Sequence, residues 1–401
     1  MLLHQISTHG NSDAPFIVAM DDSLLRKTGK KIPPVQFYRD PLSPPFHPNL
    51  IRGQRFLQLS AAVSIPSGEA RMIPVDFLDA PCAKKPGKRA TDEETKLFLK
   101  MKKEMNINVY GAKILQNLRA TLDRIHPHRS LWIQIDGRFT NKTILKQLPP
   151  RTHLTGRIRH DAKLYYPVSQ AKTIPKGRIK RYGDRAPTPE QLRIDDSVPW
   201  QKVTAWMSGR YHSFKIKTLG PVLWRPAGYD QPLRVIVIAP LKYRLTKNGR
   251  VLYRQPGYLI CTDMETPIQN ILQCFVWRWD IEVNFRDEKQ IIGVGEAQVR
   301  NKSSVQNVPA FAVASYGMLL LAAVKALGVT GVTTLIPPAK WYTRSKRRAS
   351  TQDLQKQLRA EVWGEALNTV DFSGFSMETD PMDKPEKFIP SLTSSIIYSS
   401  S

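Results

Sequence analysis

Residues 275–289 read FVWRWDIEVNFRDEK and carry two bases and one acid at helical spacing. At about 100° per residue, Phe275, Arg278, Glu282 and Lys289 fall within an arc of roughly 60° on one side of a helix. The ordinary solvent-face residues project from the opposite side, namely Gln273, Asp280, Asn284, Asp287 and Glu288. A charge that points inward needs a partner, a metal ion or a polyanion to offset its lost hydration. The stretch therefore predicts a functional helix face that carries Arg278, Glu282 and Lys289.

The chain carries a large excess of positive charge. It has 60 Lys and Arg against 34 Asp and Glu, a formal net charge of +26 over 401 residues. Such an excess favours a polyanionic partner, with nucleic acid as the leading candidate. The bases form clusters at 26–31, 84–89, 172–185 and 344–348, so the whole surface is biased rather than a single tail. The length and the hydrophobic fraction of 41% support one large domain with an elaboration, or two domains.

The cysteines and the apolar segments indicate a reducing compartment and no membrane partner. Cys82, Cys261 and Cys274 are widely separated and lack CxxC or CxxH spacing, which argues against disulfides and zinc. The N-terminus has no apolar run followed by a small-residue cleavage site, so no signal peptide is predicted. The apolar segment 308–327 contains Pro309 and a lysine, and a buried core helix is expected there rather than a membrane span.

The first part of the chain alternates short apolar strands with helices. Strands are predicted at 16–20 and 131–135, and each is followed directly by acids, Asp21-Asp22-Ser23 in the first case and Asp136 in the second. The remaining elements expected here are a hairpin of 55–63 and 70–78, helices at 91–105 and 112–125, a helix after Asn141 and a strand at 153–158. This order predicts an α/β fold with a mixed sheet.

Changes in composition divide the rest of the chain. From about 160 to 262 proline, basic residues and short alternating strands predominate, which indicates a β-rich insertion. A helix then begins near Pro267 and carries the motif 275–289. We accordingly expect an N-terminal stub (1–15), the first part of a catalytic core (16–159), the β-rich insertion (160–263), the second part of the core (264–330), a basic C-terminal region (331–371) and a poorly ordered tail (372–401).

Three carboxylates stand out by position. Asp21 and Asp136 follow apolar strands, and Glu282 lies on the inward helix face, so the three together predict a hard-oxygen site. Such ligands suit Mg²⁺ or Mn²⁺. Two such ions about 4 Å apart can promote displacement at a phosphodiester.

These residues resemble the motifs of DDE transposases of bacterial insertion sequences, whose RNase H-like catalytic domain is interrupted by a β-rich insertion. In that family the first acid occupies Asp-x-Ser/Thr, here Asp21-Asp22-Ser23, and the second ends a later strand, here IQIDG at 133–137. The third acid lies in Tyr-x2-Arg-x3-Glu-x6-Lys, in which Phe275 replaces the tyrosine and lacks its hydroxyl. The resemblance covers roughly residues 15–325.

The resemblance implies a function and a set of roles. Asp21, Asp136 and Glu282 would hold two Mg²⁺ (or Mn²⁺) ions, and Arg278 and Lys289 would contact DNA phosphates. The implied protein is a transposase endonuclease that cuts element ends and transfers strands into target DNA, as a homodimer in a synaptic complex in the bacterial cytoplasm, associated with the nucleoid. Relatives of this type carry a helical DNA-binding domain before the first acid, whereas only twenty residues precede Asp21, so we expect a shortened copy.

Several alternatives stay open at this stage. Asp22 competes with Asp21, because a strand buried on both faces gives no parity signal. An acid after a strand is typical of turns, and Glu282 with Arg278 is also a standard i, i+4 helix pair. For Trp277 and Trp279 we expect packing rather than stacking on bases. The alternative functions are an RNase H-like nuclease without strand transfer, and a truncated or inactive transposase-derived DNA-binding protein.

Overall fold

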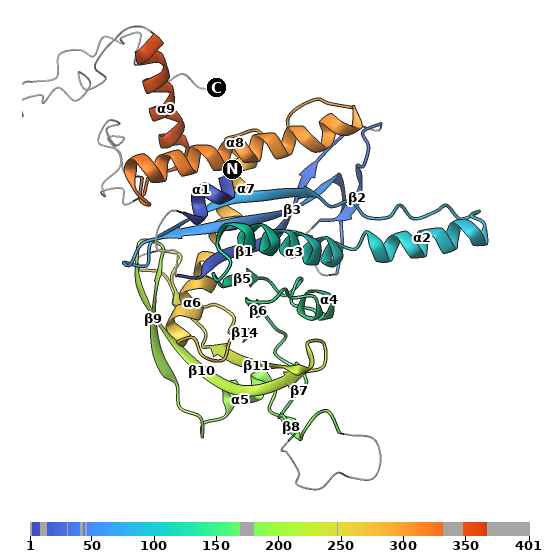
Figure 1. The fold of residues 1–401 in the computed structure, drawn as a ribbon. Helices are drawn as coiled ribbons and strands as arrows, with labels where there is room; N and C mark the ends of the chain where they lie inside the picture. Colours follow the sequence, from blue (N-terminus) through green and yellow to red (C-terminus); the bar gives the residue numbers. More distant parts are fainter. Residues whose placement is uncertain are drawn as a thin grey trace, which may run out of the picture.

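A mixed β-sheet flanked by helices forms the centre of the protein (Figure 1). The computed structural model describes residues 2–8, 14–29, 31–40, 43–44, 46–168, 180–246, 248–331 and 348–366. The predicted α/β class with a mixed sheet is confirmed. The tail predicted at 372–401 and about half of the basic C-terminal region, namely 332–347 and 367–371, lie outside the described residues.

β1 (Phe16–Arg26) is the strand around which the core is built. It pairs antiparallel with β3 (Leu50–Ser64) and parallel with β5 (Leu131–Ile135). The neighbouring core strands are β2 (Gln36–Arg39) and β4 (Ala70–Asp79), both paired antiparallel with β3, and β6 (Thr152–Arg157), paired parallel with β5. The predicted strands and hairpin are confirmed, but β1 continues past the predicted end at Met20, because its later residues still pair with β3.

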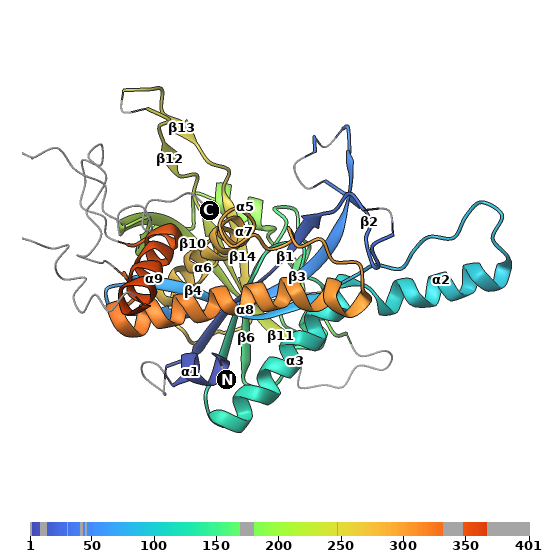
Figure 2. The same ribbon diagram turned by 90° about the horizontal axis from the view of Figure 1, so that it is seen from above.

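The strands of the predicted insertion extend the same sheet. Its twelve strands run in the order β2-β3-β1-β5-β6-β14-β11-β10-β7-β8, with β4 on β3 and β9 on β10. The added strands are β7 (Leu164–Tyr165), β8 (Arg185–Ala186), β9 (Gln201–Met207), β10 (Arg210–Trp224), β11 (Gly228–Ile238) and β14 (Gly257–Cys261). β14 joins the two parts because it pairs with both β6 and β11. A separate hairpin, β12 (Lys242–Tyr243) and β13 (Leu252–Tyr253), projects from the body in Figure 2.

The helices between β4 and β6 follow their sequence signals. Thr91 and Glu94 form the predicted capping box at the start of α2 (Asp92–Glu104). α3 (Ile107–Ile125) starts earlier than predicted because the Asn106 side chain accepts a hydrogen bond from the Asn108 N–H and caps it. The short helices are α1 (Leu2–Ser7), α4 (Lys142–Lys146) and α5 (Pro189–Ile194).

The motif at 275–289 occupies two helices rather than one. α6 (Ile268–Trp277) ends and α7 (Asp280–Gln290) begins around Arg278 and Trp279. The chain stays in the right-handed helical region at both residues, and the Trp279 N–H donates to the Val276 carbonyl at 3.2 Å, the shorter i, i+3 spacing of a tightened turn. The prediction that Phe275, Arg278, Glu282 and Lys289 share one narrow face of a single continuous helix is therefore wrong in detail.

The face of α7 that the sequence assigns to solvent is buried. Asn284, Asp287 and Glu288 are 2%, 4% and 2% exposed. The Asn284 amide donates to Ser60 Oγ on β3, and the hydroxyl of Thr351, the first residue of α9 (Thr351–Ala366), donates to Asp287 Oδ2 at 2.6 Å. The prediction was wrong because residues from distant elements satisfy these polar groups, and their helical spacing alone cannot reveal such partners.

Asp280 and Gln273, the other two residues assigned to solvent, also have partners. Arg348 donates to Asp280 Oδ2 at 2.6 Å. The Gln273 amide donates to the Trp206 carbonyl at 3.1 Å and its oxygen accepts from the Trp206 N–H at 2.6 Å, which ties α6 to β9. The helix pair is thus fixed on its outer side by β9 and by the segment before α9.

α8 (Lys302–Leu327) covers the predicted apolar helix and starts earlier, capped by Asn301. By length and composition it could cross a membrane. Here it packs along β4, with Val313, Tyr316 and Leu320 buried. It lies across the top of the sheet in Figure 1.

Glu288 makes protein stability depend on pH. Burial raises the pKa of this carboxyl to about 8, and a hydrogen bond from Gln58 opposes the shift only partly. Because the folded-state pKa lies above the unfolded value, its contribution is complete below about pH 4.5 and is lost as pH rises towards 8. Glu288→Gln should therefore raise the unfolding free energy at pH 8 by on the order of 1 to 4 kcal/mol and flatten its pH dependence, measured by urea denaturation.

Glu93→Gln serves as the control, since Glu93 is exposed on α2. It should leave the pH profile of the wild type unchanged. Equal profiles for Glu288→Gln and the wild type would show that Glu288 is charged in the folded protein at neutral pH.

Candidate active site

Two of the predicted acids lie side by side at one edge of the sheet. Met20 and Ile135 are the last residue pair between the parallel strands β1 and β5, so Asp21 and Asp136 each come next along the chain. Both strands are thereby directed towards the same edge. Glu282 lies in the first turn of α7, which packs on β1. The three acids thus come from β1, the end of β5 and α7.

Arg278 links two of these acids. Its Nη1 lies 3.4 Å from Asp21 Oδ2, and its Nη2 lies 3.6 Å from Glu282 Oε1. The arginine is only 8% exposed, and its guanidinium lies 5.6 Å from the centre of the Phe275 ring. The predicted i, i+4 pair is therefore present, but the arginine also reaches the first acid, which a purely helical pair would not explain.

Negative charge is crowded at this edge. Burial raises the pKa of Asp21 to about 7, the charge of Asp136 adds to the shift, and Arg278 opposes it. Burial also raises the pKa of Glu282, where Arg278 opposes the shift and Asp136 reinforces it. Asp136 therefore acts electrostatically on both of the other acids, as expected of carboxylates that share one site.

Asp136 is held by the turn that follows β5. Its Oδ1 accepts hydrogen bonds from the Arg138 N–H at 2.9 Å and the Phe139 N–H at 3.3 Å. These bonds are those of an aspartate turn, so the structural role weighed for this residue is present. They fix one carboxylate oxygen and the orientation of the group beside Asp21.

Asp21 and Asp22 have different partners. Both oxygens of Asp22 lie 2.8 Å from Nη1 of Arg138, whereas Asp21 contacts Arg278. Successive side chains point to opposite faces of a strand, so only one of the two can face α7. Asp21 lies on the side of Arg278 and Glu282, which favours it over Asp22 as the first acid of the site.

Lys289 lies on the same helix but contacts none of the three acids within hydrogen-bonding distance in the described structure. It is half-buried, with its ammonium 6.0 Å from the centre of the Phe285 ring. Burial lowers its pKa, while the charge of Glu288 raises it, that of Arg26 lowers it and that of Asp22 raises it. The charges that act on Lys289 are thus those of Glu288, Arg26 and Asp22 rather than those of the three acids.

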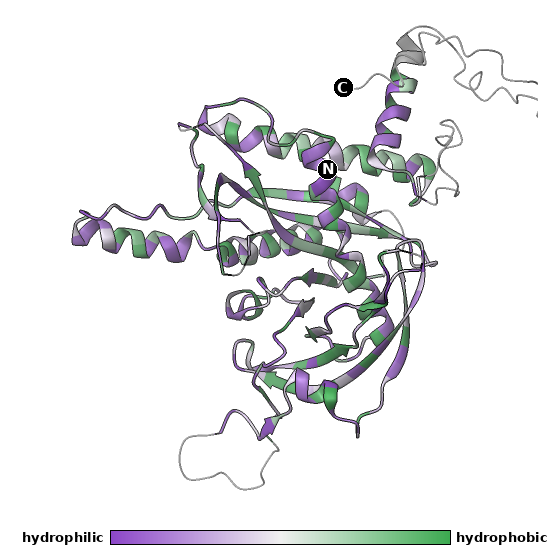
Figure 3. Cartoon of the chain, turned by 180° about the vertical axis from the view of Figure 1, so that it is seen from behind, coloured by the Kyte–Doolittle hydropathy of each residue, from purple (hydrophilic) through white to green (hydrophobic). Residues whose placement is uncertain are grey.

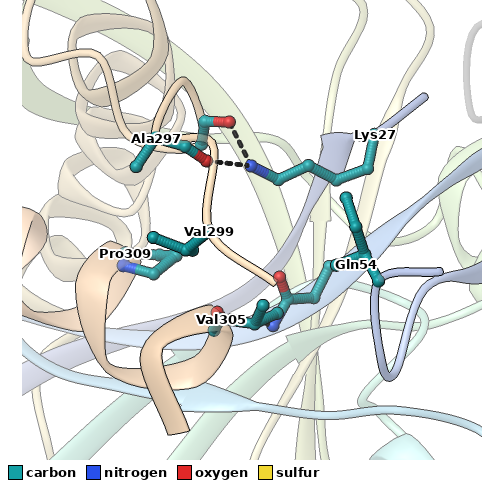
Figure 4. A pocket seen from close by; sticks show the side chains of 8 residues that line it. Lys27, Gln54, Ala297, Val299, Val305 and Pro309 are labelled. Atoms are coloured by element: carbon teal, nitrogen blue, oxygen red, sulfur yellow. Dashed lines mark hydrogen bonds between the residues drawn. The ribbon is translucent and has the colours of Figure 1, made fainter. Parts of the chain in front are cut away.

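Lys27 ties β1 to the segment after α7 and was missed by sequence reasoning. Its ammonium donates to the carbonyl of Gly295 and, at 3.4 Å, to that of Ala297 (Figure 4). Gly295 has φ of +100°, a conformation that favours glycine. Within the basic cluster 26–31, nothing in the sequence distinguishes this lysine from its neighbours.

Arg138 was also missed, although it follows Asp136 by two residues. It forms the ion pair with Asp22 and remains half-exposed beside the site. Trp277 packs as predicted, with its indole N–H donating to the Gly68 carbonyl at 2.9 Å. The packing prediction is wrong for Trp279, which is 60% exposed because it occupies the outer side of the α6–α7 turn.

The three acids fit a divalent cation in donor type and in charge. All donors are carboxylate oxygens, and their mutual repulsion would be offset by a cation. As arranged, however, the described residues contain no group of three or more His, Cys, Asp or Glu side chains close enough to hold a metal ion. A cation at Asp21 and Glu282 would have to compete with the guanidinium of Arg278.

Comparisons with known proteins do not assign the chain. No model of a protein family matches it, and the search of curated proteins finds no match. The chemistry of the site therefore rests on its own geometry: crowded, partly buried carboxylates beside a buried arginine, level with the carboxyl end of β5.

Divalent ions should stabilise the folded protein through these acids. At a hundredfold excess over Kd, Mg²⁺ or Mn²⁺ should add about 2.7 kcal/mol of unfolding free energy, visible as a rise in Tm. Asp21→Asn and Glu282→Gln should each abolish most of that rise, because each removes one anionic ligand.

Asp161→Asn is the matched control, since Asp161 lies in an exposed ion pair with Arg159. It should keep the full response to metal. A metal response in Asp21→Asn equal to that of the wild type would remove Asp21 from the site.

Proposed function

We propose that this chain is a DDE-type DNA transposase, in which Asp21, Asp136 and Glu282 catalyse phosphodiester cleavage at element ends and strand transfer into target DNA. The observation that carries the proposal is the convergence of these three acids, together with the contacts of Arg278 to Asp21 and Glu282 at 3.4 and 3.6 Å. The spacing of Arg278, Glu282 and Lys289 resembles that of the transposase motif.

The topology supports an RNase H-like core. β4, β3 and β1 are antiparallel neighbours, and β5 and β6 add to them in parallel with β1. The first acid lies on β1 and the second directly follows β5. The strands between β6 and α6 correspond to the β-rich insertion expected between the second and third acids.

The acids would hold Mg²⁺ or Mn²⁺. When bound, such ions supply positive charge to the attacking and leaving oxygens of the phosphodiester. The backbone N–H groups of Arg138 and Phe139 orient Asp136 towards this shared site. Arg278 suits a two-pronged contact to a DNA phosphate, and Lys289 supplies a point charge further along α7.

The proposed reaction has two steps. Water attacks the phosphorus at the element end, an O–P bond forms and the P–O3′ bond breaks, which frees a 3′-hydroxyl and leaves a 5′-phosphate. That hydroxyl then attacks a phosphodiester of the target, forms a new 3′ ester and releases a 3′-hydroxyl of the target strand. The proton lost by each attacking oxygen passes to solvent or to a carboxylate of the site, and the leaving 3′ oxygen takes up a proton from the same sources.

The partners follow from the same proposal. The net charge of +26 suits DNA, and binding should weaken steeply with salt. We further propose that the protein acts as a homodimer, which holds two element ends in a synaptic complex. The complex would form in the bacterial cytoplasm, at the nucleoid.

Substitution of each acid separates catalysis from binding. Asp21→Ala, Asp136→Ala and Glu282→Ala should each reduce Mg²⁺-dependent cleavage by at least about a thousandfold, since removal of one essential charged group typically has effects of this order. DNA affinity, measured on a labelled duplex, should stay within about threefold of the wild type because the basic surface is untouched. Asp22→Ala is the matched control and should retain cleavage.

The fate of the 3′-hydroxyl distinguishes transposase from nuclease. Incubation of a labelled precut element end with plasmid DNA should give a joined product on a denaturing gel. Cleavage without any joined product would contradict strand transfer and favour the nuclease, and DNA binding without cleavage would favour an inactive derivative.

A further inference from the structure

α2 stands away from the rest of the protein. None of its thirteen residues is buried, and Figures 1 and 2 show it projecting beyond the sheet and the other helices. A free helix of about this length is marginal in water, and most helices in proteins are stabilised by packing. The capping box at Thr91 and Glu94 supports α2 locally, but in the described structure no packed face does.

The segment leaves the body at the edge of the sheet where the acids lie. Asp79 at the end of β4 is paired with Phe56, which is paired in turn with Ser23 of β1, two residues after Asp21. β4 therefore ends level with the residues that follow Asp21 on β1, with β3 between the two strands, and the chain continues from there through residues 80–91 into α2. A substrate lying along this edge could extend over the projecting segment.

The projecting segment is basic over most of its length. Residues 84–104 contain eight Lys or Arg and four Asp or Glu. Three of the acids lie in the first turn of α2, where they complement the helix dipole, and the following turns carry four lysines. Lys96, Lys100 and Lys103 recur at i, i+4 and i+7, so they line one side of the helix over about 10 Å.

These lysines are available to a partner. Each of the three is exposed, and among the described residues none of them forms an ion pair with an acid. Lysines in a row without direct ion pairs, on a helix that buries no residue, place like charges close together, and these charges repel one another. A polyanion would relieve that repulsion along the whole row.

We propose that residues 84–104 form a basic arm that binds the backbone of the DNA duplex flanking the cut site. This inference rests on the proposed function and adds to it a surface outside the acids and the insertion. Charge complementarity favours DNA as the occupant over a second copy of the chain, whose net charge is also strongly positive. The apolar residues Leu97 and Met101 lie on other sides of the helix from the lysine row and provide a separate test.

The salt dependence of binding tests the arm. The triple variant Lys96→Gln, Lys100→Gln, Lys103→Gln of the full chain is titrated onto a fluorescein-labelled DNA duplex at several KCl concentrations. The slope of log K against log[KCl] should become shallower by about 2.7, or about 0.9 for each lost phosphate contact. Cleavage at saturating DNA should remain at the wild-type level, because the arm contributes no residue to the acids.

A second triple variant controls for net charge. Lys113→Gln, Lys142→Gln, Lys325→Gln removes the same charge from exposed positions on α3, α4 and α8, and it should change the slope by less than half as much. Equal slopes for the two triple variants would contradict DNA binding by the arm. An unchanged slope in the Lys96, Lys100, Lys103 variant would contradict it as well. Leu97→Ser with Met101→Ser should leave the slope as in the wild type. A loss of binding in that pair, accompanied by dissociation of a dimer in light scattering, would assign the arm to a second copy instead.

Failure of the arm and failure of the proposed function are distinguishable. A wild-type chain that neither binds nor cuts the duplex contradicts both. A wild-type chain that binds and cuts, with unchanged slope in the Lys96, Lys100, Lys103 variant, contradicts only the arm.

Discussion

The buried guanidinium of Arg278 is the interaction on which the arrangement of the acids depends. It lies between Asp21 and Glu282, within 3.4 and 3.6 Å of their oxygens, while Asp136 adds a third negative charge nearby. Without a cation the carboxylates would repel one another or take up protons. Among the described residues, Arg278 is the only base that forms an ion pair with Asp21 or Glu282, so it neutralises part of their charge within the folded chain itself. The contact makes the arginine an internal counterion; under the proposed function it would also bind a DNA phosphate, once divalent ions replace it beside the acids.

The position of Arg278 is set by the α6–α7 turn and by the hydrogen bonds and the ion pair that attach α7 to neighbouring elements. Buried polar bonds from Asn284 and Asp287 attach the helix to β3 and to α9, and Arg348 fixes its first turn through Asp280. Lys27 binds the segment after α7 to the end of β1. The bonds from Asn284, Asp287 and Asp280 connect α7, which carries Glu282, to β3, to α9 and to the segment before α9.

Much of the fold follows from local signals, and the acids follow from their position relative to the strands. The apolar runs before Asp21 and Asp136 predicted two buried strands, because burial on both faces leaves a continuous hydrophobic stretch. The structure pairs these strands as neighbours. The capping box at Thr91 was likewise visible. The burial of one face of α7 could not be predicted, because Asn284 and Glu288 have the same spacing whether they contact water or partners far away in the sequence. The family motif favoured Asp21 over Asp22, whereas the strand pattern alone did not distinguish them. In the structure Arg278 contacts Asp21 and Arg138 contacts Asp22.

In the proposed mechanism, acids from β1, β5 and α7 form one cation site. Replacement of Mg²⁺ by Fe²⁺ in the presence of ascorbate generates hydroxyl radicals at the bound ion, and these cleave the polypeptide close to it. Mapping of the fragments by mass spectrometry should show cuts near Asp21, Asp136 and Glu282 together, suppressed by excess Mg²⁺. Cuts at only one of the three acids, or cuts elsewhere that Mg²⁺ suppresses, would contradict a shared site.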